Sequence, residues 1–337
     1  MSILVVGSVA LDSIQTPFGR VREALGGAAT YFSAVASLYD RVQLVGVVGS
    51  DFPQEHIDFL VQRGVDIRGL QVAQGKTFRW SGRYDYDMNR CETLSTELNV
   101  FASFRPVLPD DYRNAEYVFL ANIDPELQLS VVEQVRAPRL IALDTMNYWI
   151  DYKREALTEA LKRVDIVLMN EAEARQYGQT FSLIRAARKI LDLGPKALIV
   201  KKGEYGAVLM ANGGDLTRSF FFAPAFPLEK IADPTGAGDT FAGGFMGYLA
   251  RTEAGAGGKP PHDLAIRQAI VHGTIVASFT VEGFSLERLR TLTLDDIRGR
   301  YEAFKRFTSF EMPCPWLDTC ERWRETQLNG SIASQRG

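Results

Sequence analysis

The stretch Asp233–Phe245 reads DPTGAGDTFAGGF and is the most informative part of the chain. Its small residues Gly236, Ala237 and Gly238 stand just before apolar residues at helical spacing, which predicts that a helix begins there. The first amides of a helix lack partners within it, and small side chains leave them uncovered. With the positive end of the helix dipole, these amides form a site suited to a phosphate or a developing anion.

Asp239 follows this loop directly. A carboxylate beside an anion site is electrostatically unfavourable unless its charge is used, and a general base that takes a proton from an attacking hydroxyl would use it. The alternative is that Asp239 only caps the helix, because aspartate is common in first turns. The residues of this short glycine loop leave both interpretations open.

The stretch as a whole resembles the C-terminal signature of the ribokinase-like (PfkB) family of sugar and nucleoside kinases, D-T-x-G-A-G-D-x-F, with Pro234 at the usual threonine. The resemblance implies that Asp239 is the catalytic base and that the amides of Gly236, Ala237 and Gly238 stabilise the transferring phosphoryl group. It also implies a three-layer α/β/α fold with a mostly parallel central sheet and a small projecting β-sheet lid. Capping and catalysis by Asp239 can coexist.

Length and composition indicate a soluble globular protein that binds small molecules. The chain has 337 residues, 46% of them hydrophobic, which is enough for a large α/β domain plus a smaller element. A net charge of -3 and a pI near 5.8 argue against nucleic acid or a membrane surface as partner. Its three cysteines and three histidines show no metal-ligand spacing, so a reduced cytoplasm is the simplest setting. The first residues read as a strand rather than a signal peptide, and no apolar run has transmembrane length.

The amino-terminal part offers candidates for acceptor binding. Ile3–Val6 reads as a buried strand, and Asp12 is predicted in the loop after it, either as a turn residue or at the ligand-binding edge of the sheet. Gly26 and Gly27 precede a helix of small residues and permit close approach of a ligand. The family holds substrate hydroxyls with an Asp in this first loop and opens the helix with G-G-x-x-x-N. Tyr31 stands at the usual Asn, so its phenol either donates to the acceptor or closes the pocket.

Residues 76–104 change to alternating polar and aromatic positions, which predicts a β hairpin. In ribokinase-like kinases this region, with about residues 12–22, forms the lid over the substrate and sometimes a dimer interface. An aromatic face on a small sheet must be covered by substrate, by a partner chain or by its own domain. The sequence leaves these three open.

Strands then alternate with helices, which predicts a parallel sheet covered on both faces. The predicted strands are Tyr117–Leu120, Leu140–Asp144, Asp165–Met169 and Ala197–Val200. Asn170 and Glu173 follow the third of these in an N-x-x-E pattern, which alone indicates a capping box. By resemblance to the family, they help to hold magnesium, largely through water.

Nucleotide contacts are implied for four further residues. The run after the last strand resembles the family's T-x-G-x-x-G, with Lys201 at the usual Thr and with Gly203 and Gly206 in place. Lys201 either pairs with nucleotide phosphates or is a solvated charge at a strand end. His272 stands where the family borders the adenine, although a lone histidine is more often structural. Asp233, Thr235 and Gly283 resemble the loop pair that binds a monovalent cation such as potassium in many members.

The resemblance covers residues 1–300, a kinase domain with the lid strands inserted. Residues 301–337 are left as a C-terminal extension of unknown role. Trp316 and Trp323 are candidates for docking this tail. The sequence predicts an ATP-dependent, magnesium-using kinase for a hydroxyl of a small sugar, polyol or nucleoside, and a possible homodimer through the lid. No Walker-type phosphate loop occurs, and Gly7-Ser8-Val9-Ala10 lacks the dinucleotide fingerprint of an oxidoreductase. The remaining alternative is a catalytically silent family member that binds a nucleotide or sugar as a regulator.

Overall fold

The computed structural model describes residues 1–212, 219–252 and 263–309. The chain divides into two units, Met1–Tyr301 and Glu302–Gly337. Trp316 and Trp323 lie outside the described residues, so their docking and the role of the extension stay predictions. None of the helices in the described ranges combines the length and apolar character that a membrane crossing requires.

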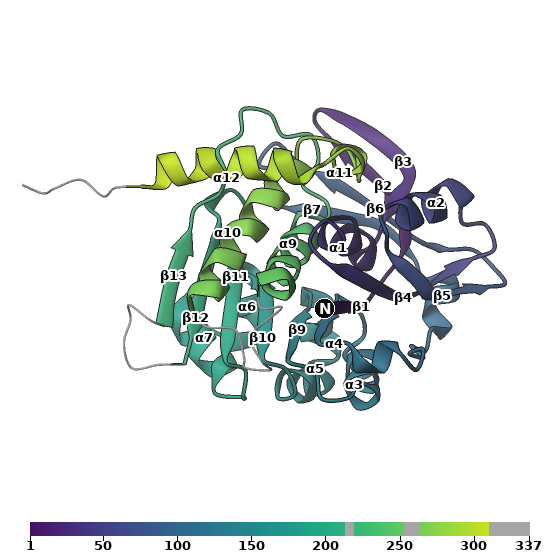
Figure 1. Ribbon diagram of the computed structural model, residues 1–337, viewed down its shortest axis with the longest axis horizontal. Helices are drawn as coiled ribbons and strands as arrows, with labels where there is room; N and C mark the ends of the chain where they lie inside the picture. Colours follow the sequence, from purple (N-terminus) through teal and green to yellow (C-terminus); the bar gives the residue numbers. More distant parts are fainter. Residues whose placement is uncertain (213–218, 253–262, 310–337) are drawn as a thin grey trace, which may run out of the picture. The chain divides into compact units, whose positions relative to one another are not determined.

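A nine-stranded sheet forms the centre of the first unit, in the order β13-β12-β11-β10-β9-β8-β1-β4-β5 (Figure 1). Its strands are β1 (Ser2–Val6), β4 (Arg41–Gly49), β5 (Asp66–Ala73), β8 (Tyr117–Leu120), β9 (Leu140–Asp144), β10 (Ile166–Asn170), β11 (Ala197–Lys201), β12 (Ala207–Ala211) and β13 (Phe220–Ala223). All neighbouring pairs are parallel except those that involve β12 and β13. The predicted, mostly parallel sheet is confirmed. Edge strand β5 was not predicted from the sequence.

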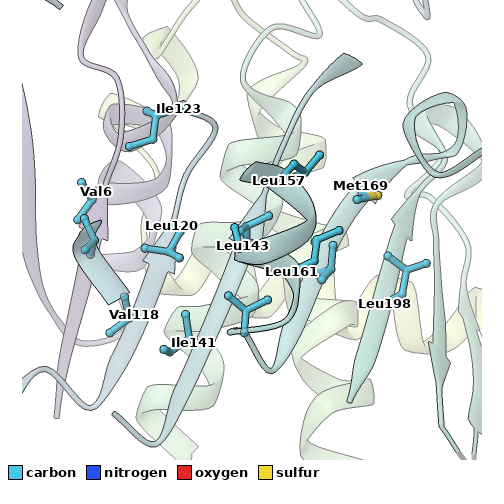
Figure 2. Packing of buried hydrophobic residues seen from close by; sticks show 14 of the residues in the cluster. Val6, Val118, Leu120, Ile123, Ile141, Leu143, Leu157, Leu161, Met169 and Leu198 are labelled. Atoms are coloured by element: carbon cyan, nitrogen blue, oxygen red, sulfur yellow. The ribbon is translucent and has the colours of Figure 1, made fainter. Parts of the chain in front are cut away.

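Helices pack on both faces of this sheet. The helices of the described residues are α1 (Ala28–Ala36), α2 (Gln54–Gln62), α3 (Pro125–Gln134), α4 (Asn147–Tyr152), α5 (Arg154–Leu161), α6 (Glu171–Gly178), α7 (Leu183–Leu191), α9 (Ala237–Thr252), α10 (Asp263–Thr280), α11 (Glu287–Arg290) and α12 (Leu294–Thr308). Short 3-10 turns are η1 (Asn99–Ser103), η2 (Tyr112–Asn114) and η3 (Gly203–Tyr205). One face meets α3, α5, α6 and α7 through alternate strand residues such as Val118, Leu120 and Leu143, which contact Leu157 and Leu161 in one apolar cluster (Figure 2).

The opposite face meets α1 and its neighbours. Phe32 of α1 stacks on Phe119 of β8 with ring centroids 4.5 Å apart, and Phe119 points away from the cluster that holds Val118 and Leu120. Helix α9 packs against α1 and α10 on this side (Figure 1). The three-layer α/β/α architecture follows, and it places the start of α9 at the carboxyl ends of the parallel strands.

A separate four-stranded sheet has the order β3-β2-β6-β7. Its strands are β2 (Ala10–Thr16), β3 (Gly19–Gly26), β6 (Phe78–Tyr84) and β7 (Cys91–Glu97). The predicted hairpin is the antiparallel pair β6–β7, and β2 pairs in parallel with β6. Asp12 corrects one expectation, because it lies inside β2 and not in a loop after β1. Only three residues separate the end of β1 at Val6 from the start of β2 at Ala10, so the chain passes from the main sheet almost directly into the lid sheet.

Candidate active site

The predicted anion loop opens α9 with one positive backbone angle. Gly236 has φ of 76°, which favours glycine, and its carbonyl accepts from the Thr240 amide at 2.8 Å. The Ala237 amide donates back to the Pro234 carbonyl at 3.2 Å, so it closes the turn. This corrects the expectation that all three loop amides face an anion. Among the described residues the Gly238 amide donates to no acceptor, and it is therefore available to a ligand.

Tyr31 of α1 supports this loop from within the protein. A Cβ at position 236 would lie 2.4 Å from the Tyr31 ring, so only a glycine leaves room for it. The side chain is 1% exposed, and burial raises its pKa, as do the nearby charges of Asp12 and Asp233. The structure thus shows the Tyr31 ring packed beneath the loop. Donation to the acceptor and closure of the pocket both stay predictions for this residue.

Asp239 lies half-buried in the first turn of α9, beside the Gly238 amide. Burial raises the pKa of Asp239 from its ordinary value of 3.8 to about 7. The charge of Asp144 raises it further, while the Lys201 ammonium opposes both effects. A carboxylate that titrates near neutral pH matches the requirement of a general base.

Lys201 ends strand β11 and pairs with the buried carboxylate of Asp144, its Nζ lying 2.5 Å from Oδ2. Its side chain is 18% exposed, and a Cβ at position 238 would lie 3.1 Å from Nζ. Burial lowers the pKa of Lys201, but Asp144, Glu173 and Asp239 outweigh this and raise it. A solvated strand-end charge is therefore the wrong interpretation of Lys201. The ammonium lies against the anion loop, among three carboxylates.

Asn170 and Glu173 form the capping box that their spacing indicates. The Glu173 amide donates to Asn170 Oδ1, and the Glu173 carboxylate accepts from the backbone and side-chain nitrogens of Asn170, all within 2.7–2.8 Å. Burial raises the pKa of Glu173 to about 7; the Lys201 ammonium opposes this, and the charges of Asp144 and Asp239 reinforce it. The role of Asn170 and Glu173 in holding magnesium stays a prediction. The capping box is compatible with it, because each carboxylate oxygen keeps acceptor capacity for a metal-bound water.

The described residues contain no group of three or more His, Cys, Asp or Glu arranged to hold a metal ion directly. Mg²⁺ usually keeps several waters and relies on substrate phosphates with one or two carboxylates, so it does not need such a group. The cluster of Asp144, Glu173 and Asp239 around one lysine fits this mode of binding, since it carries excess negative charge.

Asp12 faces the loop from the lid sheet. Its Oδ2 lies 1.9 Å from the place that a Cβ on residue 26 would occupy, which explains the glycine there. Gly27 has φ of 93° at the start of α1. Burial raises the pKa of Asp12 to about 7; the Gly27 amide opposes this, and the charges of Asp233 and Asp239 reinforce it. The structure thus brings Asp12 and Asp239 into electrostatic contact.

The loop before α9 is joined to the loop after α10 through Asp233. Its carboxylate is fully buried and accepts from the Thr235 amide at 2.9 Å and the Ser285 amide at 3.0 Å. Ser285 also donates to the carbonyl of Leu25 in β3. The predicted cation residues Asp233, Thr235 and Gly283 therefore lie in two adjacent loops.

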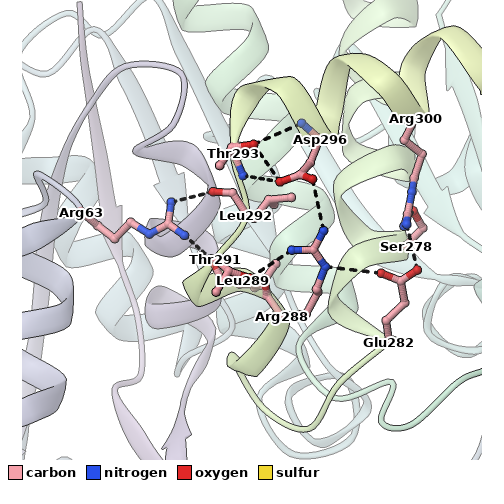
Figure 3. A network of polar contacts seen from close by, with 10 residues as sticks. All are labelled: Arg63, Ser278, Glu282, Arg288, Leu289, Thr291, Leu292, Thr293, Asp296 and Arg300. Atoms are coloured by element: carbon pink, nitrogen blue, oxygen red, sulfur yellow. Dashed lines mark hydrogen bonds and ion pairs between the residues drawn. The ribbon is translucent and has the colours of Figure 1, made fainter.

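Polar contacts hold the second of these loops in place. Arg300 donates to Ser278 at 2.9 Å and to Glu282 at 2.8 Å, and Arg288 approaches Glu282 at 3.8 Å (Figure 3). Arg63 at the end of α2 donates to the carbonyls of Leu289 and Leu292 (Figure 3). These contacts fix the chain on either side of Gly283.

The lid touches the nucleotide side of the site at two points. Thr235 Oγ1 donates to the Tyr84 hydroxyl of β6 at 3.3 Å. At the tip of the β6–β7 hairpin, Asn89 donates to Glu204 at 3.2 Å, and its Oδ1 lies 2.7 Å from the place of a Cβ on Gly203. No pattern in the sequence points to Tyr84 or Asn89, because contacts between residues so far apart in the chain leave no periodic signal.

Gly203, Gly206 and His272 lie at different places. Gly203 and Gly206 have φ of 56° and 97° in the turn after β11, next to Lys201. His272 lies in the middle of α10, where its ring stacks on Tyr248 and Tyr301 with centroids 4.2 and 5.2 Å away. Burial lowers the pKa of His272 to about 4. This packing accounts for His272 as a structural residue and gives no support to an adenine contact.

Comparisons with known proteins identify the family of the chain. The family model described as pfkB family carbohydrate kinase matches residues 2–287. The chain is 33% identical to the cytidine kinase of Thermococcus kodakarensis over 257 residues, 74% of this chain and 89% of that protein. It is 28% identical to a nucleoside kinase of Methanothermobacter thermautotrophicus over 91% of this chain and 96% of that protein.

The structure of ribokinase from Giardia lamblia superimposes with a TM-score of 0.76 at 17% identity, covering 90% of this chain and 99% of that one. At this identity the likeness shows the fold. The family match and the cytidine kinase relative go further, because one spans nearly the whole chain and the other exceeds 30% identity. The chain therefore belongs to the pfkB family of carbohydrate kinases and is a phosphotransferase with an alcohol group as acceptor.

Proposed function

We propose that the protein transfers the γ-phosphoryl group of ATP to a hydroxyl of a nucleoside, with sugars and polyols as the wider class. The observation that carries the proposal is the placement of Asp239 beside the available Gly238 amide and in the electrostatic range of Asp12. The relatives named as cytidine and nucleoside kinases support a nucleoside among the possible acceptors. ATP as donor and magnesium follow from the family.

In this mechanism Asp239 accepts the proton of the acceptor hydroxyl. The acceptor oxygen forms the new bond to the γ-phosphorus, the bond between that phosphorus and the bridging β–γ oxygen breaks, and ADP leaves. The Gly238 amide and the dipole of α9 stabilise charge on the transferring group. Asp12 orients the acceptor by accepting from another of its hydroxyls. The protein contributes position and charge, which phosphoryl transfer mainly requires.

Lys201 and the nearby carboxylates organise the donor. The ammonium against Gly238 is within reach of a phosphate held by the loop, and it acts as a point charge there. Magnesium, held through water by Asn170 and Glu173, would neutralise phosphate charge when bound. The lid, which touches Thr235 and Gly203, excludes water that would otherwise hydrolyse ATP.

A monovalent cation, potassium in the first place, fits the loop pair of Asp233, Thr235 and Gly283. Asp233 is fully buried and, among the described residues, receives only neutral donors and no cationic side chain. A buried charge is stable only when it is compensated, so a cation would stabilise this carboxylate. We expect turnover to rise severalfold in potassium chloride over choline chloride at equal ionic strength. Equal rates in the two salts would remove the cation from the proposal.

The test of the function is a coupled ADP-release screen with magnesium and ATP over ribose, fructose derivatives, inositol and nucleosides. We expect turnover with at least one acceptor and strict dependence on magnesium. Binding of ATP by calorimetry without turnover on any acceptor would favour the silent, regulatory alternative. A homodimer through the lid stays a prediction, and light scattering of the purified protein tests it.

A further inference from the structure

The lid sheet carries an aromatic side chain whose orientation is fixed by a glycine. Trp80 of β6 pairs in register with Asp12 of β2, so both side chains project from the same face of the sheet. Gly82, two residues later, lies on that face too. A Cβ at Gly82 would lie 2.1 Å from Trp80 Cη2 and 2.8 Å from Cys91 Sγ. The indole therefore lies flat across Gly82 and reaches toward β7.

A hydrogen bond to the neighbouring strand completes this arrangement. Trp80 Nε1 donates to Thr93 Oγ1 at 3.4 Å, and Thr93 is the partner of Gly82 in the β6–β7 ladder. Glycine inside a strand weakens it and often marks the close approach of another group. Here that group is the indole of Trp80. Its close approach explains why residue 82 is a glycine, and the contact fixes one orientation of the indole.

The indole packs against Gly82 and has no aromatic partner among the described residues. Trp80 is half-buried, and no ring stacking or cation–π contact within the described residues involves it. The same face of the lid carries Asp12 on one neighbouring strand and Tyr84 farther along β6, which reaches Thr235 beside the anion loop. The half-buried indole thus shares its face of the lid with Asp12 and with Tyr84, the residue that contacts the loop before α9.

We propose that Trp80 is the specificity-determining residue that stacks on an aromatic base attached to the acceptor sugar. This inference rests on the proposed function and deepens it, because a free sugar or inositol offers no flat ring to stack on an indole. Asp12 binds a hydroxyl of the sugar, and the adjacent strand presents Trp80 to the base. Stacking tolerates different bases, since every base has a π face.

The experiment compares kinetic constants for the best nucleoside found in the screen. We expect Trp80→Ala to raise the KM of the nucleoside by about 10- to 100-fold, as loss of one base-stacking contact implies. We expect kcat to stay within about threefold and the KM of ATP to stay unchanged, because Trp80 lies on the acceptor side. Phe181→Ala is the matched control, because Phe181 is 85% exposed and lies away from the lid, between α6 and α7.

A second pair of variants keeps the test decisive if Trp80→Ala does not fold. Trp80→Phe and Trp80→Leu both retain apolar volume, but only phenylalanine can stack. A KM that follows the order Trp, Phe, Leu supports the inference, and equal KM values for Phe and Leu overturn it. An equal rise in the KM of ATP also overturns the inference. So does a Trp80→Ala variant that dissociates a dimer but keeps the KM of the nucleoside, because Trp80 would then be buried in the dimer interface.

The outcomes separate this inference from the proposed function. An enzyme that phosphorylates ribose or inositol and no nucleoside would refute the role of Trp80 and leave Asp239 as the base. Loss of activity in Asp239→Asn with no change of nucleoside KM in Trp80→Ala would do the same.

Discussion

Replacing Asp239 with asparagine tests the catalytic centre through turnover and through stability. The substitution keeps the shape of the side chain and removes the base. We expect kcat to fall by a factor on the order of 100 or more. ATP binding, measured by calorimetry, should stay nearly intact, because the Gly238 amide and Lys201 remain. Unchanged turnover in Asp239→Asn would remove the assignment of the base.

The same variant should be more stable than the wild type at alkaline pH. The pKa of Asp239 is raised from 3.8 to about 7 by burial and by Asp144, so the folded protein holds this proton more tightly than the unfolded chain. The charged form therefore lowers stability above pH 7, and the loss disappears as the pH falls toward 4. The full difference corresponds to ~4 kcal/mol. Partial exposure of the side chain reduces this to about 2 kcal/mol.

Thermal melts of the ligand-free protein measure this effect. We expect Asp239→Asn to melt about 4 °C above the wild type at pH 8.5 and the advantage to shrink at pH 5. Asp295→Asn serves as the control, because that carboxylate is 85% exposed on α12 and should show no pH-dependent gain. An advantage of equal size at both pH values, or a destabilised variant at pH 8.5, would refute the argument from burial.

Two further predictions concern the surroundings of the base. Lys201→Thr should raise the KM of ATP by about tenfold, as loss of one charged phosphate contact implies. The Lys201 ammonium lowers the pKa of Asp239 against burial and the charge of Asp144, so its loss should also move the acidic limb of the kcat/KM profile to higher pH. An unmoved limb would contradict the pairing. Asn89→Ala should loosen the lid at Gly203 and Glu204 and raise acceptor-independent ATP hydrolysis by about threefold, a change of roughly 0.7 kcal/mol that one exposed hydrogen bond can supply. Hydrolysis equal to that of the wild type would show that the contact does not close the lid.

The parts of the fold that follow from local pattern could be predicted from the sequence. Continuous apolar strands alternating with helices gave the parallel sheet, and alternation in residues 76–104 gave the hairpin, because side-chain periodicity reports which faces are buried. Edge strand β5 and the position of Asp12 could not be read this way. In the lid sheet, Asp12 pairs with Ala24 of β3 and with Trp80 of β6. Pairing between residues so far apart in the chain leaves no local signature.

The candidate site shows the same limit at single residues. The spacing of Asn170 and Glu173 predicts a capping box, and the structure contains it, because capping is decided within one helical turn. The Ala237 amide departs from expectation because it donates to the Pro234 carbonyl and closes the turn. The packing of the Tyr31 ring against Gly236 could not be predicted, because it depends on how α1 meets the loop before α9.

The two departures from the family signatures that matter most meet at the anion loop. Tyr31 stands at the usual Asn and contacts Gly236, while Lys201 stands at the usual Thr and lies against Gly238. Neither contact would form with the shorter residue, since a phenol ring and a lysine stem are needed to reach the loop backbone. The loop is thus held by packing at its first residue and by charge at its third. This gives each substitution a local reason and predicts that changing either one alters the loop more than a distant surface residue does.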